Sequence, residues 1–388
     1  MRIQRIAPAV LAVAALAACQ SSGEPPVLVA TPSISPATAV PPSVTPSPSP
    51  SVQKKAAPEV RTLPGPGNPS GRAAVPDAAR AVDTSDPDRT IGNGTAAGCT
   101  SAAVLKAVAA GGVITFDCGP EPVVITMTAT AKIRNPVSRV VLDGGNRVTL
   151  SGGGKRRILL LDACDTSLGV SRSGGHCHDT ATPRLTVQNL ALRDGNATDP
   201  TDEDGGGGAI FVRGGGLTVV NSRFTGNRCH RTGPDLGGGA IRVRLQGANQ
   251  PVYVVGSTFT GGICANGGAL SSIGVSWTVL NSRFTGNRAV GTGANPARDG
   301  TPGGGSGGAI YQDGDTYRLT LNGTVLDGNR AAEGGGAVFF VSNDRTGSLT
   351  IRNSTLRRNV SEGFESDGLP GIFYLGAGGP AISGSRLS

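Results

Sequence analysis

This sequence has few aromatic side chains, no long apolar run and no strict three-residue period in its glycines. Aromatic residues make up 4% of the 388 residues, so no large aromatic core is available. The alanine-rich run Ile6–Ala18 is shorter than the ~20 residues that a membrane-spanning helix needs. The 61 glycines lack a strict three-residue period, which excludes collagen. Because an interior glycine destabilises a helix by roughly 1 kcal/mol relative to alanine, this glycine content disfavours a helical bundle.

Glycine and proline dominate what is present. Together, the 61 glycines and 27 prolines are almost twice as frequent as in an ordinary globular protein, where they amount to roughly 12%. The apolar fraction of 37% is low, but it exceeds that of a fully disordered chain. The composition predicts a β protein with many glycine turns, built as one domain with a flexible extension.

The N-terminus has the pattern of an export signal. Arg2 and Arg5 precede the apolar run Ile6–Ala18, as in a signal peptide. The run ends in Leu-Ala-Ala-Cys, which resembles the bacterial lipobox. The resemblance implies that residues 1–18 are removed and that Cys19 is lipidated, which would anchor the protein to the outer face of the cell membrane. The alternative is an ordinary secretion signal with an incidental cysteine.

Residues 19–92 are predicted to form the lipidated cysteine and a disordered tether, followed by a folded domain at 93–388. The stretch Thr31–Val52 is uncharged and rich in proline, serine and threonine, so it cannot bury enough apolar surface to fold. The net charge of +8 then lies mostly on the folded domain, as arginine. This surplus favours anionic partners such as acidic glycans. No dense basic run indicates nucleic acid, and the membrane is contacted only through the lipid.

The cysteine count also indicates export. Six cysteines follow Cys19, and an even number in an exported chain implies disulfides. We favour sequential pairing: Cys99 with Cys118, Cys164 with Cys177, and Cys229 with Cys264. The alternative is a metal site around His176-Cys177-His178 and Cys229-His230. Since that spacing matches no common zinc pattern, we expect no metal.

Internal repeats are the strongest signal. Five segments begin Gly-Gly-Ala followed by an aliphatic residue, with their alanines about 30 residues apart at Ala209, Ala240, Ala269, Ala309 and Ala337. Between them recurs the motif Asn-Ser-Arg-Phe-Thr-Gly-Asn, at Asn221–Asn227 and Asn281–Asn287. Short β-branched runs separated by glycine turns predict stacked coils, in which each strand pairs with its equivalent one coil away. Asparagine suits such turns because it tolerates the left-handed region, and its amides can stack into a ladder.

These motifs resemble those of right-handed parallel β-helix proteins in the pectate-lyase-like superfamily, and especially the repeats of bacterial polymorphic outer-membrane proteins. The resemblance covers roughly Val113–Phe373. It implies an all-β fold, a right-handed single-stranded parallel β-helix (β-solenoid). The residues before it, Thr100-Ser101 and Ala102–Ala110, predict a short N-terminal capping helix over the first coil.

The resemblance does not select an activity, because the superfamily contains lyases, hydrolases, epimerases and adhesins. The Asn-Thr-Asp, Asp-Asp, Gly-His-Gly and Arg-Ile-Lys motifs of polygalacturonases are absent. Calcium-binding nonapeptide repeats are absent too, since aliphatic residues follow the glycines. We therefore expect no cofactor, and the sequence gives no support to a calcium ion. Whether the chain is an enzyme stays open.

Strand alternation in the Gly-Gly-Ala segments suggests a binding face. The aliphatic residues Ile210, Ile241, Leu270, Ile310 and Val338 should face the core. The next positions should then face outward and form an exposed stripe for a saccharide, with the binding residues Phe211, Arg213, Arg242, Tyr311 and Phe339. The candidates for catalysis are an acid/base pair and two arginines that would neutralise a uronate: Asp204, Asp235, Arg242 and Arg244. The alternative is an ordinary polar surface.

Three functions compete. The first is a membrane-anchored extracellular lipoprotein that displays a β-helix for polysaccharide binding, surface binding or adhesion. The second is a divergent polysaccharide lyase or glycoside hydrolase. The third is a passive structural spacer. Absence of every known catalytic motif favours the first, with a polysaccharide or cell-surface glycan, acidic in character, as the partner.

Overall fold

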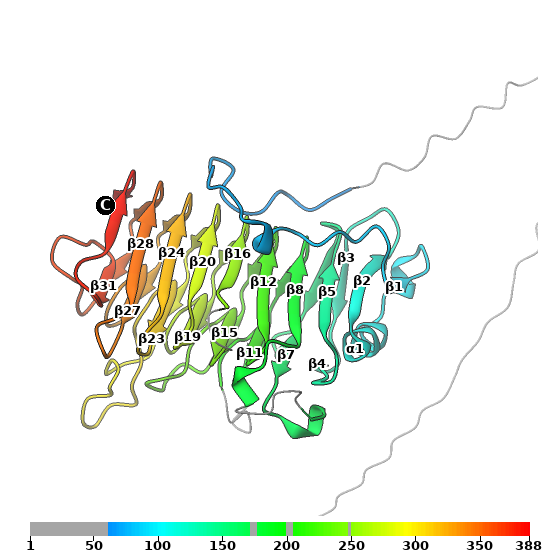
Figure 1. Ribbon diagram of the computed structural model, residues 1–388, viewed down its shortest axis with the longest axis horizontal. Coiled ribbons are helices and arrows are strands. Elements are labelled where there is room, and N and C mark those ends of the chain that lie inside the picture. Colours follow the sequence, from blue (N-terminus) through cyan, green and yellow to red (C-terminus); the bar gives the residue numbers. More distant parts are fainter. Residues whose placement is uncertain (1–60, 171–176, 199–204, 247–249) are drawn as a thin grey trace, which may run out of the picture. The chain divides into compact units, whose positions relative to one another are not determined.

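The computed structural model describes residues 61–170, 177–198, 205–246 and 250–388. The predicted signal peptide, Cys19 and the tether up to residue 60 lie outside the described residues, as does Asp204. The described chain forms four sheets in which every strand pair is parallel (Figure 1). The predicted all-β parallel β-helix is therefore confirmed.

Two sheets are long. Sheet 1 has ten strands, in the order β1 (Arg89–Gly92), β2 (Gly112–Asp117), β5 (Arg139–Asp143), β8 (Arg184–Gln188), β12 (Gly216–Val220), β16 (Val252–Val255), β20 (Trp277–Leu280), β24 (Arg318–Asn322), β28 (Ser348–Arg352) and β32 (Ala381–Ser383). Sheet 2 has nine, in the order β3 (Val123–Thr126), β6 (Val148–Ser151), β9 (Ala191–Arg193), β13 (Arg223–Thr225), β17 (Thr258–Thr260), β21 (Arg283–Thr285), β25 (Val325–Asp327), β29 (Thr355–Arg357) and β33 (Arg386–Leu387).

The other two sheets are shorter. Sheet 3 has eight strands and contains the Gly-Gly-Ala segments, in the order β31 (Ile372–Leu375), β27 (Val338–Val341), β23 (Ile310–Asp313), β19 (Leu270–Ile273), β15 (Ile241–Arg244), β11 (Ile210–Arg213), β7 (Leu159–Asp162) and β4 (Ala131–Ile133). Sheet 4 has six two-residue strands, in the order β10 (Asn196–Ala197), β14 (Arg228–Cys229), β18 (Ile263–Cys264), β22 (Arg288–Ala289), β26 (Arg330–Ala331) and β30 (Val360–Ser361).

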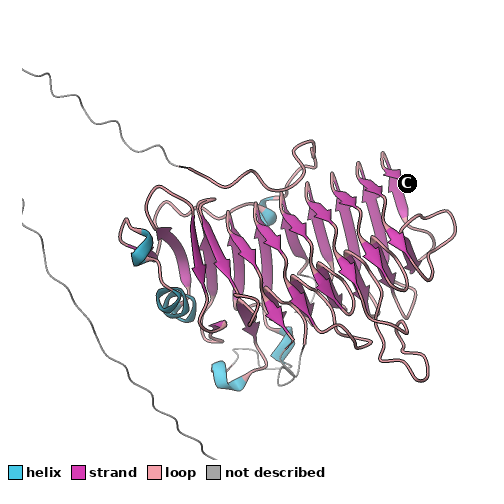
Figure 2. Ribbon diagram, turned by 180° about the vertical axis from the view of Figure 1, so that it is seen from behind, coloured by secondary structure: helices cyan, strands magenta, loops and turns pink. Residues whose placement is uncertain are grey.

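The chain passes through the sheets in a fixed order. One coil runs from sheet 3 to sheet 1, then to sheet 2 and sheet 4, as in β11, β12, β13 and β14, and the next coil begins at β15. Neighbours in a sheet therefore come from successive coils, and the strands stack along one axis (Figure 2).

Helices are few. The one α-helix of the described chain, α1 (Ser101–Ala110), lies against β4 and β1 at the first coils, as predicted for a capping helix (Figure 1). Thr100 caps it, since its hydroxyl accepts a hydrogen bond from the Ala103 amide at 3.2 Å. The described residues also contain four short 3₁₀ segments: Asp77–Ala79, Ala96–Gly98, Thr166–Leu168 and Cys177–Asp179. None of the described helices combines the length and apolar character that a bilayer crossing needs.

Stacked rows of identical or similar side chains fill the interior. The aliphatic row predicted from the Gly-Gly-Ala segments is fully buried and paired in register, as Ile210, Ile241, Leu270, Ile310 and Val338. From the second motif, Phe224, Phe259 and Phe284 stack with ring centroids 4.6 and 4.7 Å apart. Phenylalanines are few, but the repeat places each one directly above the last.

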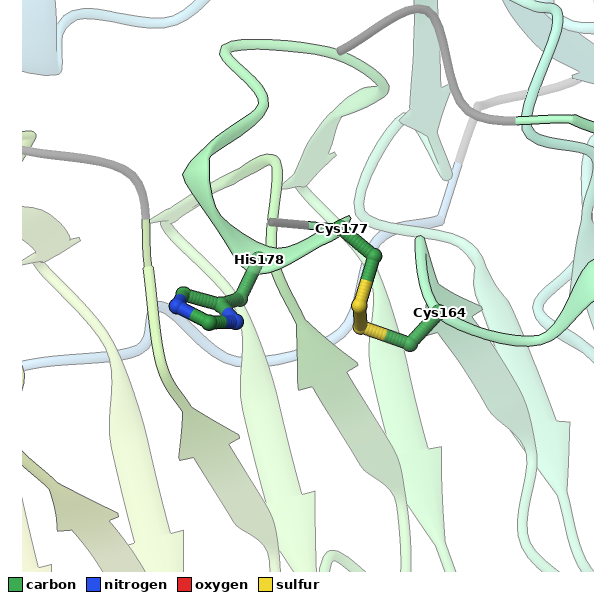
Figure 3. Close-up of side chains that lie close together, drawn as sticks. All are labelled: Cys164, Cys177 and His178. Atoms are coloured by element: carbon green, nitrogen blue, oxygen red, sulfur yellow. A yellow bond between two sulfur atoms is a disulfide. The ribbon is translucent and has the colours of Figure 1, made fainter. Parts of the chain in front are cut away.

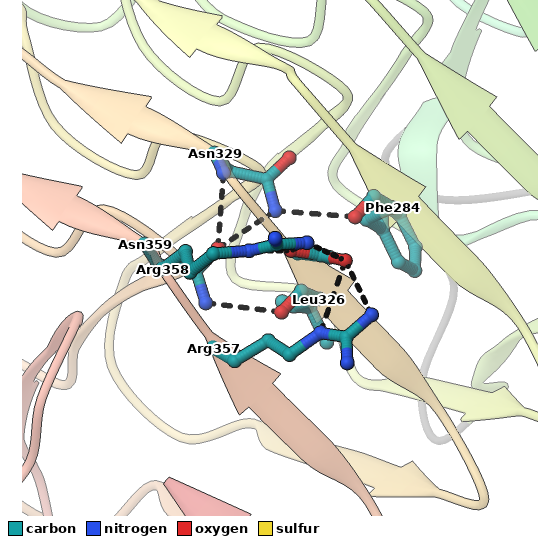
Figure 4. Close-up of polar contacts among 7 residues, drawn as sticks. Phe284, Leu326, Asn329, Arg357, Arg358 and Asn359 are labelled. Atoms are coloured by element: carbon teal, nitrogen blue, oxygen red, sulfur yellow. Dashed lines mark hydrogen bonds and ion pairs between the residues drawn. The ribbon is translucent and has the colours of Figure 1, made fainter. Parts of the chain in front are cut away.

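Asparagines occupy two kinds of turn, as predicted. At the corner between sheets 1 and 2, Asn221 and Asn281 have φ of 46° and 51°, in the left-handed region. At the corner between sheets 2 and 4, the amides form a buried ladder (Figure 4). The Asn287 amide donates to Asn329 Oδ1 at 2.9 Å, and the Asn329 amide donates to Asn359 Oδ1 at 2.9 Å. Each ladder amide also donates to a strand carbonyl, which satisfies buried backbone groups at the turn.

A buried carboxylate lies beside this ladder. Asp327 ends β25 and is 5% exposed, and it accepts hydrogen bonds from the guanidinium groups of Arg357 and Arg358 on the next coil (Figure 4). Burial alone would raise the pKa of Asp327, but the hydrogen bonds from Arg358 and Arg357 outweigh burial and hold that pKa below its usual value. The ionised carboxylate therefore connects two coils.

Three disulfides have the predicted sequential pairing. Cys99 is bonded to Cys118, with the Cα atoms 5.6 Å apart, and this bond ties the segment before α1 to the end of β2. Cys164 is bonded to Cys177 in the loop that follows β7. Cys229 and Cys264 join β14 and β18, which are neighbours in sheet 4.

The predicted end of the tether, at residue 92, does not match the structure. Residues 89–92 form β1, and residues 61–88, which we call the strap, lie on the coils. The side chain of Asn281 both accepts from the Ala73 amide at 2.8 Å and donates to the Ala73 carbonyl at 2.9 Å. Gln188 makes the same pair of bonds to Val82. These side-chain amides bond backbone groups of the strap that have no neighbouring strand to pair with.

The predicted saccharide stripe is in register but is not exposed. Strand pairing aligns Phe211, Arg242, Ser271, Tyr311 and Phe339 across successive coils. Yet Phe211, Arg242, Tyr311 and Phe339 are at most 2% exposed. The prediction that these side chains face solvent is therefore wrong.

Segments outside the repeats cover the stripe. Gly206 lies so close to Arg242 that a Cβ atom there would be 2.6 Å from Arg242 Cδ. Phe364 packs edge-on against Phe339, with ring centroids 6.4 Å apart. The stripe is a stacked internal row, in which the Tyr311 and Phe339 rings are 5.1 Å apart.

The burial of the stripe predicts a large effect of truncation. Phe339→Ala should lower the free energy of unfolding by about 3–5 kcal/mol, because a buried aromatic leaves a cavity among its neighbours. Val360→Ala is the control, since Val360 is 43% exposed and its change should stay within about 0.5 kcal/mol. Urea denaturation of both variants measures this. A Phe339→Ala variant as stable as the control would contradict the burial.

Candidate arginine pocket

An outward row of arginines runs along sheet 4. Parallel pairing aligns Arg228, Ile263, Arg288, Arg330 and Val360 on five successive coils. The neighbouring row of the same strands, which contains Cys229, Cys264, Ala289 and Ala331, is buried. Because successive side chains of a strand point to opposite faces, the row that contains the arginines points outward, and its three arginines are exposed. We call Arg228, Arg288 and Arg330 the arginine row.

A hollow of about 220 Å³ opens beside the arginine row. Seven residues line it: Arg231, Arg288, Ala289, Val290, Arg330, Ala332 and Glu362. We call it the arginine pocket. Three guanidinium groups and one carboxylate thus surround small aliphatic side chains, a combination that suits an anion with an apolar body.

The charges of the arginine pocket are not balanced. Arg330 forms an ion pair with Glu362. Arg231 and Arg288 have no hydrogen-bond or ion-pair partner for their side chains anywhere in the described chain. Both side chains are exposed to solvent. The pocket therefore offers two guanidinium groups for a carboxylate or another oxyanion.

A second hollow, of about 280 Å³, lies on the outer face of sheet 1. It is lined by Pro251, Ser276, Trp277, Thr278, Arg318 and Thr320. It contains a single charged side chain, Arg318, and its one aromatic side chain, Trp277, is 1% exposed. This hollow therefore provides neither the charge nor an open aromatic platform that would hold a glycan.

A polar cluster lies under the loop of residues 291–305. The side-chain nitrogen of Asn295 donates to Asp235 Oδ1 at 3.2 Å, to Asp313 Oδ2 at 2.7 Å and to the Tyr311 hydroxyl. The Tyr311 hydroxyl also donates to Asp313 at 3.0 Å. We call these four residues the Asn295 cluster.

Burial shifts the titration of the Asn295 cluster. It raises the pKa of Asp313; hydrogen bonds from Tyr311 and Gly314 oppose that rise, and the negative charge of Asp235 adds to it. Burial likewise raises the pKa of Tyr311 well above its usual range, with a further contribution from Asp313. Asp313 therefore holds its proton to higher pH than an exposed aspartate, beside the exposed carboxylate of Asp235.

The sequence-predicted candidates do not form one site. Arg213 is committed to Asp162, to which it donates at 2.7 and 2.6 Å. Arg242 is buried and donates to Ser271 at 3.0 Å. Arg244, next to it along β15, is also largely covered. The predicted carboxylate Asp235 lies within the described residues. The side-chain amide of Asn295 links it to Asp313 by donating a hydrogen bond to each carboxylate. The repeats did not indicate this link.

Sequence reasoning missed the arginine row, although a signal was present. Each of its arginines follows the last asparagine of the second motif, as Asn227-Arg228, Asn287-Arg288 and Asn329-Arg330. Because equivalent residues of successive coils pair in register, an arginine at the same place in three repeats forms one straight row.

A third cluster consists of a disulfide and an imidazole. His178 lies beside the bonded pair Cys164 and Cys177, with their sulfur and nitrogen atoms within 4.8 Å of one another (Figure 3). Metal coordination by cysteine requires thiolates, and sulfurs joined in a disulfide are not thiolates. Of the other residues in the metal alternative, His176 lies outside the described residues, and Cys229, beside His230, is bonded to Cys264.

Comparisons of this chain with protein-family models, with curated proteins and with solved structures found no match. The superfamily resemblance therefore stays an expectation from the motifs.

Proposed function

We propose that this chain binds an acidic polysaccharide or cell-surface glycan at the arginine pocket, on a β-helix that Cys19 anchors to the outside of the cell. The observation that carries the proposal is the pair of exposed guanidinium groups of Arg231 and Arg288 beside an aliphatic floor, neither of which has a partner among the described residues. Guanidinium groups bind carboxylates through paired, charge-assisted hydrogen bonds. The aliphatic floor offers contact to the C–H faces of a sugar ring.

Several features support a binding role over a purely structural one. Some arginines of this chain are structural, as Arg357 and Arg358 are, which both pair with Asp327. Arg231 and Arg288, by contrast, have no described partner, although side chains of their own coils surround them. Leaving positive charge unneutralised on a rigid surface raises the local concentration of anionic ligands.

Removal of the two arginines tests the proposal. The double variant Arg231→Ala/Arg288→Ala should bind polygalacturonate at least about tenfold more weakly, because each hydrogen bond to a charged group contributes about 1.5–3 kcal/mol. Titration calorimetry measures the affinity. The matched control is Arg318→Ala/Arg352→Ala, which removes the same charge from exposed positions on sheet 1 and should leave the affinity unchanged. An equal loss in both variants would mean generic charge attraction and would contradict the proposal.

A divergent glycoside hydrolase is the second candidate, and the Asn295 cluster favours it. Asp313, with its raised pKa, could protonate a glycosidic oxygen, while the exposed Asp235 activates a water. The water oxygen would bond to the anomeric carbon as the glycosidic bond breaks. Asn295 has to withdraw first, because its amide now bridges the two carboxyl groups.

Product analysis decides this second candidate. Incubation of the protein with pectin, alginate and xylan should release new reducing ends, and Asp313→Asn should abolish the release because the amide cannot act as an acid. Arg318→Ala serves as the control and should leave any release intact. Absence of new reducing ends from all three polysaccharides would rule out hydrolysis of these substrates, and an active Asp313→Asn variant would exclude the Asn295 cluster as its site.

A further inference from the structure

We propose that the disulfide between Cys164 and Cys177 controls a metal site: when a dithiol reduces it, the two thiolates and the imidazole of His178 bind Zn²⁺. This site lies in the loop after β7 and is independent of the arginine pocket. It requires a disulfide that a reductant can reach, sulfurs that stay together once their bond is broken, and an imidazole within reach of the same ion.

Among the three disulfides, this one is the most accessible to a reductant. Cys164 and Cys177 are both partly exposed, and so is His178. The cysteines of the other two disulfides are at most 7% exposed: Cys99, Cys118, Cys229 and Cys264. Because exchange requires a thiolate to reach a sulfur atom of the disulfide, a dithiol attacks the partly exposed bond first.

Contacts other than the disulfide hold its two halves in place. The Cys164 amide donates to Asp162 Oδ1 at 2.9 Å. The turn after β11 packs against both halves, since a Cβ atom on Gly214 would be 2.9 Å from Ala163 Cβ and 3.0 Å from the carbonyl oxygen of Cys177. Because both halves pack against the same turn, breaking the sulfur–sulfur bond leaves the two thiols close together.

The three donor atoms have nearly the spacing of a metal site. The sulfurs of Cys164 and Cys177 and a ring nitrogen of His178 lie within 4.8 Å of one another (Figure 3). Around a tetrahedral Zn²⁺ such donors lie about 3.5–3.8 Å apart, because Zn–S and Zn–N bonds are about 2.3 and 2.0 Å long. Asp179 Oδ1 lies 3.5 Å from His178 Nε2, where a carboxylate can orient a metal-binding imidazole. A water completes the fourth position.

Electrons and protons balance in both steps. In the first, a dithiol supplies two electrons, so the disulfide of the protein becomes two thiols and the dithiol closes into its own disulfide. In the second, each thiol releases one proton to solvent, and each thiolate donates an electron pair to Zn²⁺. The two thiolates neutralise the double charge of the ion. The oxidised pair has no thiolate, so the oxidised protein does not bind the ion there.

Titration of the full chain with Co²⁺, as a spectroscopic substitute for Zn²⁺, tests the proposal. After brief treatment with dithiothreitol and removal of the reductant under nitrogen, the protein should bind one Co²⁺ with the visible absorption bands of tetrahedral thiolate coordination. Zn²⁺ should displace it, and the oxidised protein should show no such bands. Alkylation and peptide mass spectrometry should find Cys164 and Cys177 reduced before the other cysteines. Circular dichroism should show that the reduced protein keeps its β-sheet spectrum.

A histidine variant tests the third ligand without altering the disulfide. His178→Ala should weaken Co²⁺ binding by the reduced protein at least about tenfold, because loss of a ligand costs at least as much as loss of a group that orients one. The matched control is His230→Ala, which removes an imidazole next to the buried disulfide of Cys229 and should leave the affinity unchanged.

Several results would overturn the proposal. They are reduction of a buried disulfide as fast as the one at Cys164, loss of the β-sheet spectrum on reduction, no Co²⁺ binding by the reduced protein, and equal binding by the oxidised and reduced forms. An affinity of His178→Ala equal to that of the unmodified protein, or an equal loss in His230→Ala, would exclude His178 as a ligand and overturn the site as proposed. None of these results bears on glycan binding, which the variants of Arg231 and Arg288 test separately.

Discussion

Each short strand of this protein finds its backbone partners in the equivalent strand one coil away, and the rest of the structure depends on that pairing. Parallel pairing without a shift in register means that a residue type repeated in the sequence becomes a straight row in space. Inward rows of aliphatic and aromatic residues then supply the core, although aromatics are only 4% of the chain. The same rule turns a repeated Asn-Arg into an outward line of guanidinium groups.

Polar ladders stabilise the register at the corners. A slip by one residue would break the bonds that join Asn287, Asn329 and Asn359, and it would leave buried amides and carbonyls unpaired. The carboxylate of Asp327, bonded to arginines of the next coil, adds a charged contact between coils. Corners held in this way allow sheet 4 to keep a straight outer row with only two residues per strand. Because the arginines are already held at fixed spacing, less conformational entropy is lost when a ligand binds.

Much of the fold could be predicted because the repeats carry it. The Gly-Gly-Ala period placed Ile241 and Leu270 in one buried row, and cysteine order gave the three disulfides. The candidate site was less predictable because segments outside the repeats decide exposure. The register of Phe211 and Tyr311 was predicted correctly, but their burial depends on neighbouring turns and on the loop of Asn295. Composition predicts a tether where the strap lies, because it does not show that the side chains of Asn281 and Gln188 bind the strap backbone.

Protection of arginines from chemical modification tests the central claim most directly, since that claim places the ligand at the arginine pocket. The unmodified protein would be treated with phenylglyoxal, with and without polygalacturonate, and the modified arginines identified by peptide mass spectrometry. The account predicts that the ligand protects Arg231 and Arg288 and leaves the exposed Arg318 and Arg352 reactive. Equal protection of both pairs, or protection of neither, would contradict it.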